Sequence, residues 1–247
     1  MACPKGLPGT ALWSSLTTIA DVAPENNASA VTTSTVLRLM STPRMRRYIT
    51  RCHPDPSAAL ELYRWNAGIS SGFWETMSHL EVALRNVLTE RLGARHSARE
   101  RPGSWLDNLD GELDSRAARE IQAARGRVAV KRKMASDGQT IAELSFGFWR
   151  FLLANQYSTT LWPDLASGFT HAPNRSRHTV EQPIRRLHEF RNRIAHHEPI
   201  WNKDLSARYS DILDVLGYID PELRIWAMEA CRVPDILKLC PVTRPHP

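Results

Sequence analysis

The feature that most constrains this chain is a run of apolar residues that recur at spacings of three and four from Leu62 to Leu88. Because an α-helix turns once every 3.6 residues, this spacing places the side chains on one stripe of a long helix. The stripe has to be buried, so the chain must build its core around this helix. Gly68 and Gly72 lie within the run and are candidates for a kink. The stripe consists of Leu62, Trp65, Ile69, Phe73, Met77, Leu80, Leu84 and Leu88.

The rest of the sequence predicts further helices and no strand. A short basic helix is expected from Pro43 to Arg51, before the breakers Pro54 and Pro56. Residues 112–133 are polar and suit an exposed helix or a mobile arm. Additional helices are predicted over residues 139–155 (rich in aromatic side chains), 179–197, 205–217 and 222–230. We therefore expect an all-α, single-domain helical bundle with additional C-terminal helices.

The N-terminal segment has a different composition. Residues 1–40 are rich in Ser, Thr, Ala, Pro and Asn without a sustained period, which predicts a flexible extension before a helical domain at 41–240. Its weak apolar stretch is interrupted by Pro8, so we do not expect a secretory signal. No apolar run approaches the roughly 20 residues of a membrane helix. A cytoplasmic protein that does not interact with membranes is the expectation.

Cysteine spacing and charge narrow the chemistry further. The four cysteines are scattered without a Cys-x-x-Cys pair, so neither a zinc site nor a disulfide framework is predicted. The net charge of +6 and the pI near 9.4 favour an anionic partner such as nucleic acid. A solvated basic surface is the alternative interpretation of this charge. The cysteines are Cys3, Cys52, Cys231 and Cys240.

A segment near the C-terminus, residues 187–198, includes groups that can cleave RNA without a metal ion: Arg191, Asn192 and the neighbouring histidines His196 and His197. On a helix, its apolar residues form one stripe and Arg191 lies beside that stripe. Asn192 and His196 are four residues apart and share the face turned away from the core. His197 falls on a different flank, above Arg193. The stripe consists of Ile184, Leu187, Phe190 and Ile194.

Arg191-Asn192, three residues and then His196 resemble the signature of the HEPN superfamily, and the continuation from His197 to Pro199 resembles its Abi-like (abortive infection) branch. The resemblance covers roughly residues 40 to 230. It implies a HEPN-type helical bundle, a homodimer, RNA as substrate, and a role in phage defence or as a growth-arresting toxin, with an antitoxin as a further partner. Four other segments resemble the family pattern in the family's order: Pro43-Arg44-Met45, Leu62-Tyr63-Arg64-Trp65-Asn66, Leu80-Glu81-Val82-Ala83-Leu84-Arg85-Asn86 and Phe146-Gly147-Phe148-Trp149.

The motif suits cleavage by the RNA's own 2′-hydroxyl, so neither a metal nor another cofactor is predicted. Histidine titrates near neutral pH and can carry the proton. Arg191 would stabilise the phosphorane, and Asn192 would position a phosphate oxygen or the histidine. The resemblance assigns the second proton-handling group to His196 of a second copy, while His197 of the same chain is the alternative.

Two other constellations have structural interpretations. Glu81 and Arg85 are four apart on the long helix and can pair, and Arg85-Asn86 repeats the motif's dipeptide without a following histidine. We expect these residues to fix helix packing or to support the cleft. His188 and His196 share a helix face, but no third ligand completes a metal site. The alternative functions are a non-catalytic RNA-binding or regulatory protein and a structural partner in a toxin-antitoxin pair.

Overall fold

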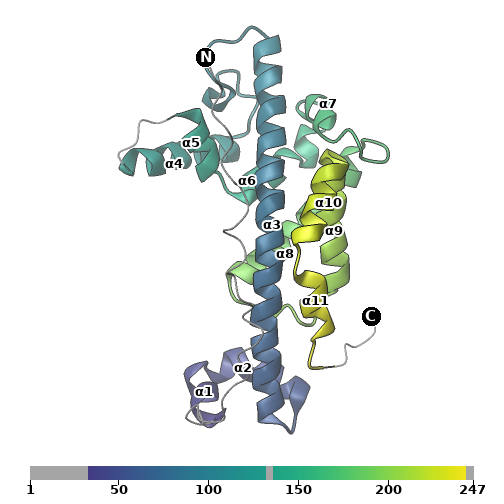
Figure 1. Ribbon diagram of the computed structural model, residues 1–247. Helices are drawn as coiled ribbons and strands as arrows, with labels where there is room; N and C mark the ends of the chain where they lie inside the picture. The colour runs from purple at the N-terminus through teal and green to yellow at the C-terminus, as the bar shows by residue number, and fades with distance from the viewer. Residues whose placement is uncertain (1–32, 132–135, 243–247) are drawn as a thin grey trace, which may run out of the picture. The chain divides into compact units, whose positions relative to one another are not determined.

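The computed structural model describes residues 33–131 and 136–242, and all regular structure in these ranges is helical (Figure 1). The predicted all-α class is therefore confirmed. The chain divides into two compact units, Met1–Arg46 and Arg47–Pro247. Most of the predicted N-terminal extension lies outside the described residues, but its end forms helix α1 (Thr33–Leu39). The predicted basic helix is present as α2 (Thr42–Cys52).

The long helix, α3 (Pro56–Ala98), has 43 residues and extends beyond the predicted stripe at both ends. It begins early because the Asp55 side chain accepts hydrogen bonds from the backbone N–H groups of Ser57 and Ala58, at 2.8 and 3.2 Å. Pro56 was expected to break a helix, but it occupies the first turn, where no intrahelical donor is lost. Every residue of the predicted stripe is buried.

Gly68 and Gly72 do not interrupt α3, which Figure 1 shows running straight. Gly72 instead allows a close approach of α11 (Val233–Lys238), because a Cβ atom there would lie 3.1 Å from Cδ1 of Ile236. The indole N–H of Trp65 also donates to the carbonyl oxygen of Ile236, at 2.8 Å. The C-terminal segment is thus attached to α3 by a polar and an apolar contact.

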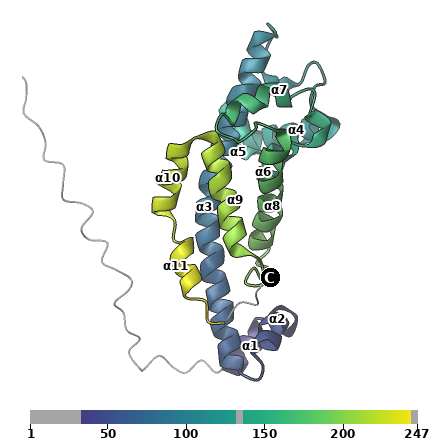
Figure 2. The same ribbon diagram turned by 90° about the vertical axis from the view of Figure 1, so that its right-hand side faces the viewer.

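Helices α8 (Arg177–Ala195) and α9 (Leu205–Ile219) lie beside α3 and each other, as Figure 2 shows. Helix α10 (Pro221–Ala230) then packs on α9. The turn between α9 and α10 is fixed by Asp220, whose side chain accepts from the Glu222 N–H at 2.7 Å. These C-terminal helices were predicted with nearly the same bounds, whereas α11 was not predicted.

The prediction of one continuous aromatic core helix over residues 139–155 is wrong. It consists of α5 (Asp137–Glu143) and α6 (Phe146–Leu152), separated by Leu144 in an extended conformation. Ser145 starts α6 by accepting a hydrogen bond from the Phe148 N–H at 3.2 Å. The preceding polar segment forms α4 (Ser115–Val130), which packs on α5. The buried residues of α4 are Ala117, Ile121, Ala124 and Val128.

Short helical turns complete the fold: η1 (Trp105–Asp107), η2 (Asn155–Tyr157), α7 (Trp162–Leu165) and η3 (Ala166–Gly168). Among the described residues, no helix is both long enough and apolar enough to cross a membrane. Cys52, Cys231 and Cys240 are free thiols, and Cys3 lies outside the described residues.

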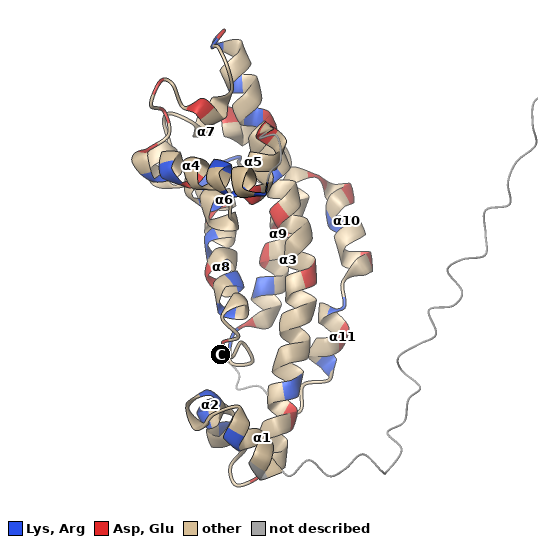
Figure 3. Ribbon diagram, turned by 90° about the vertical axis from the view of Figure 1, so that its left-hand side faces the viewer, with Lys and Arg blue, Asp and Glu red and all other residues tan. Residues whose placement is uncertain are grey.

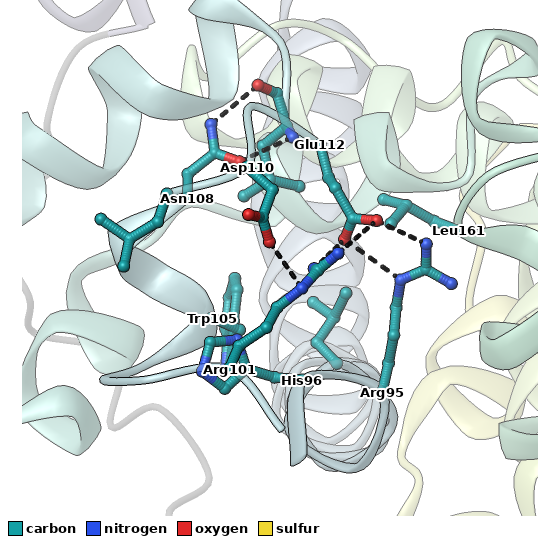
Figure 4. Close-up of a pocket in the computed structure, with 11 residues that line it drawn as sticks. Arg95, His96, Arg101, Trp105, Asn108, Asp110, Glu112 and Leu161 are labelled. Carbon is teal, nitrogen blue, oxygen red and sulfur yellow. Dashed lines mark hydrogen bonds and ion pairs between the residues drawn. The ribbon is translucent and has the colours of Figure 1, made fainter. Parts of the chain in front are cut away.

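An ion-pair network attaches the loop after α3 to the end of that helix (Figure 4). The side chain of Arg95 is only 7% exposed and donates to both Glu112 and Asp164. Arg101 pairs with Glu112 at 2.8 Å and with Asp110 at 2.5 Å. The hydrogen bond from Arg95, and then those from neighbouring arginines, lower the pKa of Glu112 from 4.5 to about 2. Glu112 is therefore the carboxylate on which this network converges.

We predict that Glu112→Gln lowers the free energy of unfolding at pH 7 by about 3 kcal/mol, because it leaves the buried Arg95 charge without its main partner. The pKa of Glu112 is lower in the folded state, so its contribution is complete above the unfolded pKa and is lost as the pH falls from 4.5 toward 2. Urea unfolding at pH 7 and pH 3 measures this difference. The matched control is Glu229→Gln, at an exposed carboxylate of α10. An equal effect of Glu112→Gln at both pH values would contradict the prediction.

Candidate functional site

Helix α8, which carries the motif, has well-defined ends. It starts two residues before the predicted capping box, because the Ser176 side chain accepts from the Thr179 N–H at 3.1 Å. It ends at Ala195, as the sequence predicted within two residues, and the His196 N–H closes the last turn on the Asn192 carbonyl at 3.0 Å. His197 adopts a positive φ of 55°. Both histidine side chains are exposed where the chain leaves the helix.

Arg191 is held between α8 and α3. Its Nε donates to Oε1 of Glu81 at 3.0 Å, and its guanidinium carbon lies 4.8 Å from the ring centroid of Trp74. The predicted pairing of Glu81 with Arg85 is therefore replaced by a pair between two helices. Within the described residues, Arg191 uses only Nε for protein hydrogen bonds. Its terminal nitrogens remain as donors for an anion.

Asn192 contacts a histidine other than the predicted one. Its Nδ2 lies 3.4 Å from Nε2 of His188, one turn earlier on the same face. The i, i+4 spacing of His188 and Asn192 could have indicated this pair from the sequence. A Cβ atom on Gly147 would lie 3.0 Å from Nε2 of His188, so the glycine makes room for the ring. The aromatic segment around Gly147 therefore packs against α8.

His188 is half-buried in an aromatic and basic environment. The rings of Phe146 and Phe151 lie at centroid distances of 6.0 and 6.2 Å from its imidazole. Burial, followed by the charges of Arg150, Arg191 and Arg116, lowers the pKa of His188 below its usual value of 6.5. This shift favours the neutral form of the His188 imidazole.

Guanidinium groups from three helices contribute to this environment. Arg116 of α4 and Arg150 of α6 lie 3.3 and 4.3 Å from the ring centroid of Phe151, and Arg191 belongs to α8. The Arg150 side chain is 15% exposed and has one weak carboxylate contact, with Glu181 at 3.5 Å. Figure 3 shows Lys and Arg residues along α8 and α4. Positively charged groups of α4, α6 and α8 are thus gathered around His188.

A pocket of about 460 Å³ lies between α3 and the C-terminal end of α8. Trp74 lies in its wall on α3, and His197 contributes from the turn after α8. His196, which helix geometry favoured over His197, does not line this pocket. Arg193 pairs with Glu198 at 2.8 Å and so stabilises the turn. The pocket is lined by Tyr63, Asn66, Ala67, Ser70, Ser71, Trp74, Ile194, Ala195 and His197.

Asn66 fixes the chain that follows the motif. It is buried in α3, and its Oδ1 accepts from the N–H groups of Ile200 and Trp201, at 2.8 and 3.0 Å. Asn66 was not predicted to have this role, although a polar residue next to Trp65 of the apolar stripe could have indicated it. Arg85 and Asn86 make no hydrogen bond or ion pair with α8 in the described part of the chain. They do not complete the motif.

We predict that Asn66→Ala lowers the free energy of unfolding by about 2–3 kcal/mol, because two buried N–H groups would lose their shared acceptor. Chemical denaturation of the purified protein measures the loss. The exposed Asn86→Ala, on the same helix, is the matched control and should change stability by less than about 0.5 kcal/mol. Equal stability of the two variants would show that Asn66 does not anchor this segment.

The described residues contain no group of three or more His, Cys, Asp or Glu side chains that could hold a metal ion. The chain matches no known family model, no curated protein and no solved structure. The resemblance to Abi-like HEPN proteins therefore rests on the sequence motifs and stays a prediction.

Proposed function

We propose that this protein is a metal-independent endoribonuclease of the Abi-like HEPN type, which cleaves RNA in phage defence or as a growth-arresting toxin. The observation that supports the proposal is that three separate segments with the family pattern contact the motif helix or the turn that follows it. Asn66 binds the chain after α8, Glu81 binds Arg191, and Gly147 accommodates His188. These contacts support a site in which the motif side chains are held in place on a partly exposed face.

In the proposed reaction, the 2′-hydroxyl of the RNA attacks the adjacent phosphorus. The new O2′–P bond forms, the P–O5′ bond breaks, and the products are a 2′,3′-cyclic phosphate and a 5′-hydroxyl. The terminal nitrogens of Arg191 stabilise the charge of the phosphorane, and Asn192 orients a phosphate oxygen. His196, exposed at the end of α8, exchanges a proton with the RNA.

Two protons have to move, one from the 2′-hydroxyl and one to the leaving oxygen. The resemblance implies a homodimer in which a second copy supplies another His196. His197 is the alternative in the same chain, and its place in the pocket wall favours contact with a bound ligand. Arg193 acts indirectly, because its pair with Glu198 holds the turn that presents both histidines.

We predict that the purified protein cleaves single-stranded RNA in EDTA, and that Arg191→Ala or His196→Ala reduces the rate at least about 100-fold. A 2′-deoxy substitution at the cleaved position should abolish cleavage there. His178→Ala, at an exposed histidine near the other end of α8, is the matched control and should retain activity. Gel analysis of labelled RNA measures these rates. RNA binding without cleavage would instead favour an RNA-binding protein, and neither activity would favour a structural toxin-antitoxin partner.

We also predict that Glu81→Gln slows cleavage roughly 10- to 100-fold while RNA affinity is retained, because the Arg191 guanidinium would lose the charge that orients it. Single-turnover rates and binding constants, measured separately, check this expectation. Glu61→Gln, at an exposed carboxylate of the same helix, provides the comparison. A parallel loss of affinity in Glu81→Gln would indicate that Glu81 supports binding instead of positioning.

A further inference from the structure

The pocket between α3 and the end of α8 has the dimensions of a ligand site. Its volume of about 460 Å³ lies within the range of about 300–1,000 Å³ that is typical of small-molecule pockets. The motif chemistry uses Arg191, Asn192 and His196, none of which lines this space. The proposed cleavage chemistry therefore does not explain this pocket, apart from the alternative proton carrier His197 in its wall.

Trp74 is the most informative residue of the pocket wall. Its side chain is 43% exposed, although a large indole normally contributes to stability by burial. The Arg191 guanidinium lies over one face of its ring, 4.8 Å from the centroid, so the other face is not covered by this cation and an aromatic surface lies next to a group that can pair with a phosphate. A nucleotide presents a flat base next to a charged phosphate, which matches this pair of groups.

The polar residues of the wall suit the edge of a base. Ser70 and Ser71 carry hydroxyl groups that can donate or accept hydrogen bonds. The Oδ1 of Asn66 is occupied by two backbone N–H groups, which fixes the amide and leaves Nδ2 as a donor. An apolar helix from another protein would leave these polar groups unsatisfied, so a heteroaromatic ligand fits the wall better.

We infer that this pocket, the Trp74 pocket, binds one unpaired nucleobase of an RNA strand, with the base stacked on the Trp74 indole and a flanking phosphate on Arg191. The inference rests on the proposed function, because it takes RNA as the ligand. It adds a requirement that the motif alone does not impose: the bound RNA must be single-stranded at this position, since a paired base cannot leave its stack to enter the pocket.

The test measures binding of a labelled single-stranded RNA by fluorescence anisotropy in EDTA, with His196→Ala as the parent so that the RNA stays intact. Trp74→Ala should weaken binding about tenfold, since stacking contributes about 1–3 kcal/mol per base. Trp74→Phe should restore most of the affinity, because the aromatic surface returns. Trp226→Ala, at a tryptophan of α10 that is 50% exposed, is the matched control and should bind like the parent.

Two further measurements identify the contact. Ala67→Phe adds a ring to the pocket wall and should weaken binding by a similar factor without removing Trp74. An RNA with a single abasic position should bind the parent about tenfold more weakly at one site only, and Trp74→Ala should add little to that loss. Additive losses would mean that the missing base and Trp74 do not touch.

The outcomes separate this inference from the proposed function. If Trp74→Ala binds RNA as the parent does, and the protein with an intact His196 cleaves RNA, the base-binding role of the pocket is wrong. The proposed nuclease function is then not contradicted. If the His196→Ala parent binds no RNA at all, the result contradicts both the base-binding inference and the proposed function. Sedimentation shows whether Trp74→Ala changes the protein from a dimer to a monomer. If it does, and the monomer binds RNA with unchanged affinity, the pocket is an interface between copies of this chain and the base-binding role is wrong.

Discussion

The arrangement of this protein depends on the burial of the apolar stripe of α3 against the apolar stripe of α8. Phe73 and Phe190 meet edge to face at 4.9 Å, and Ile184 and Leu187 are fully buried beside them. Once these stripes are in contact, the polar residues at their margins become neighbours. The contact between the two apolar stripes therefore determines which charged side chains meet, including Arg191 and Glu81.

One steric fit and two polar contacts then fix α8 and the chain after it at different positions along the helix. His188 fits against Gly147, Arg191 pairs with Glu81, and the chain beyond His197 is held by Asn66. None of them involves the exposed side chain of His196. The helix is thus anchored through one set of side chains and presents another, which is the separation that a preorganised binding face requires.

The sequence predicted the helices with a sustained apolar period, because burial of a stripe is encoded locally. It could not predict the break at Ser145, because a cap requires only one hydroxyl and the apolar residues on both sides of Ser145 continue the helical spacing. It also assigned Glu81 to its near neighbour Arg85. The actual partner, Arg191, is 110 positions away in the chain, and such a contact follows from the packing of helices and not from spacing along one helix.

The ion pairs of Arg95 and of Arg191 differ in what they can contribute to stability. The Arg95 side chain is 7% exposed, so its partners offset a large desolvation cost and matter for stability. Arg191 and Glu81 are each 29% exposed, and pairs with such access to water contribute only about 0–1 kcal/mol. The pair with Glu81 therefore contributes more to the direction of the Arg191 guanidinium beside Trp74 than to folding stability. It leaves the terminal nitrogens of Arg191 without a hydrogen bond to the described residues, and the proposed function assigns these nitrogens to a phosphate.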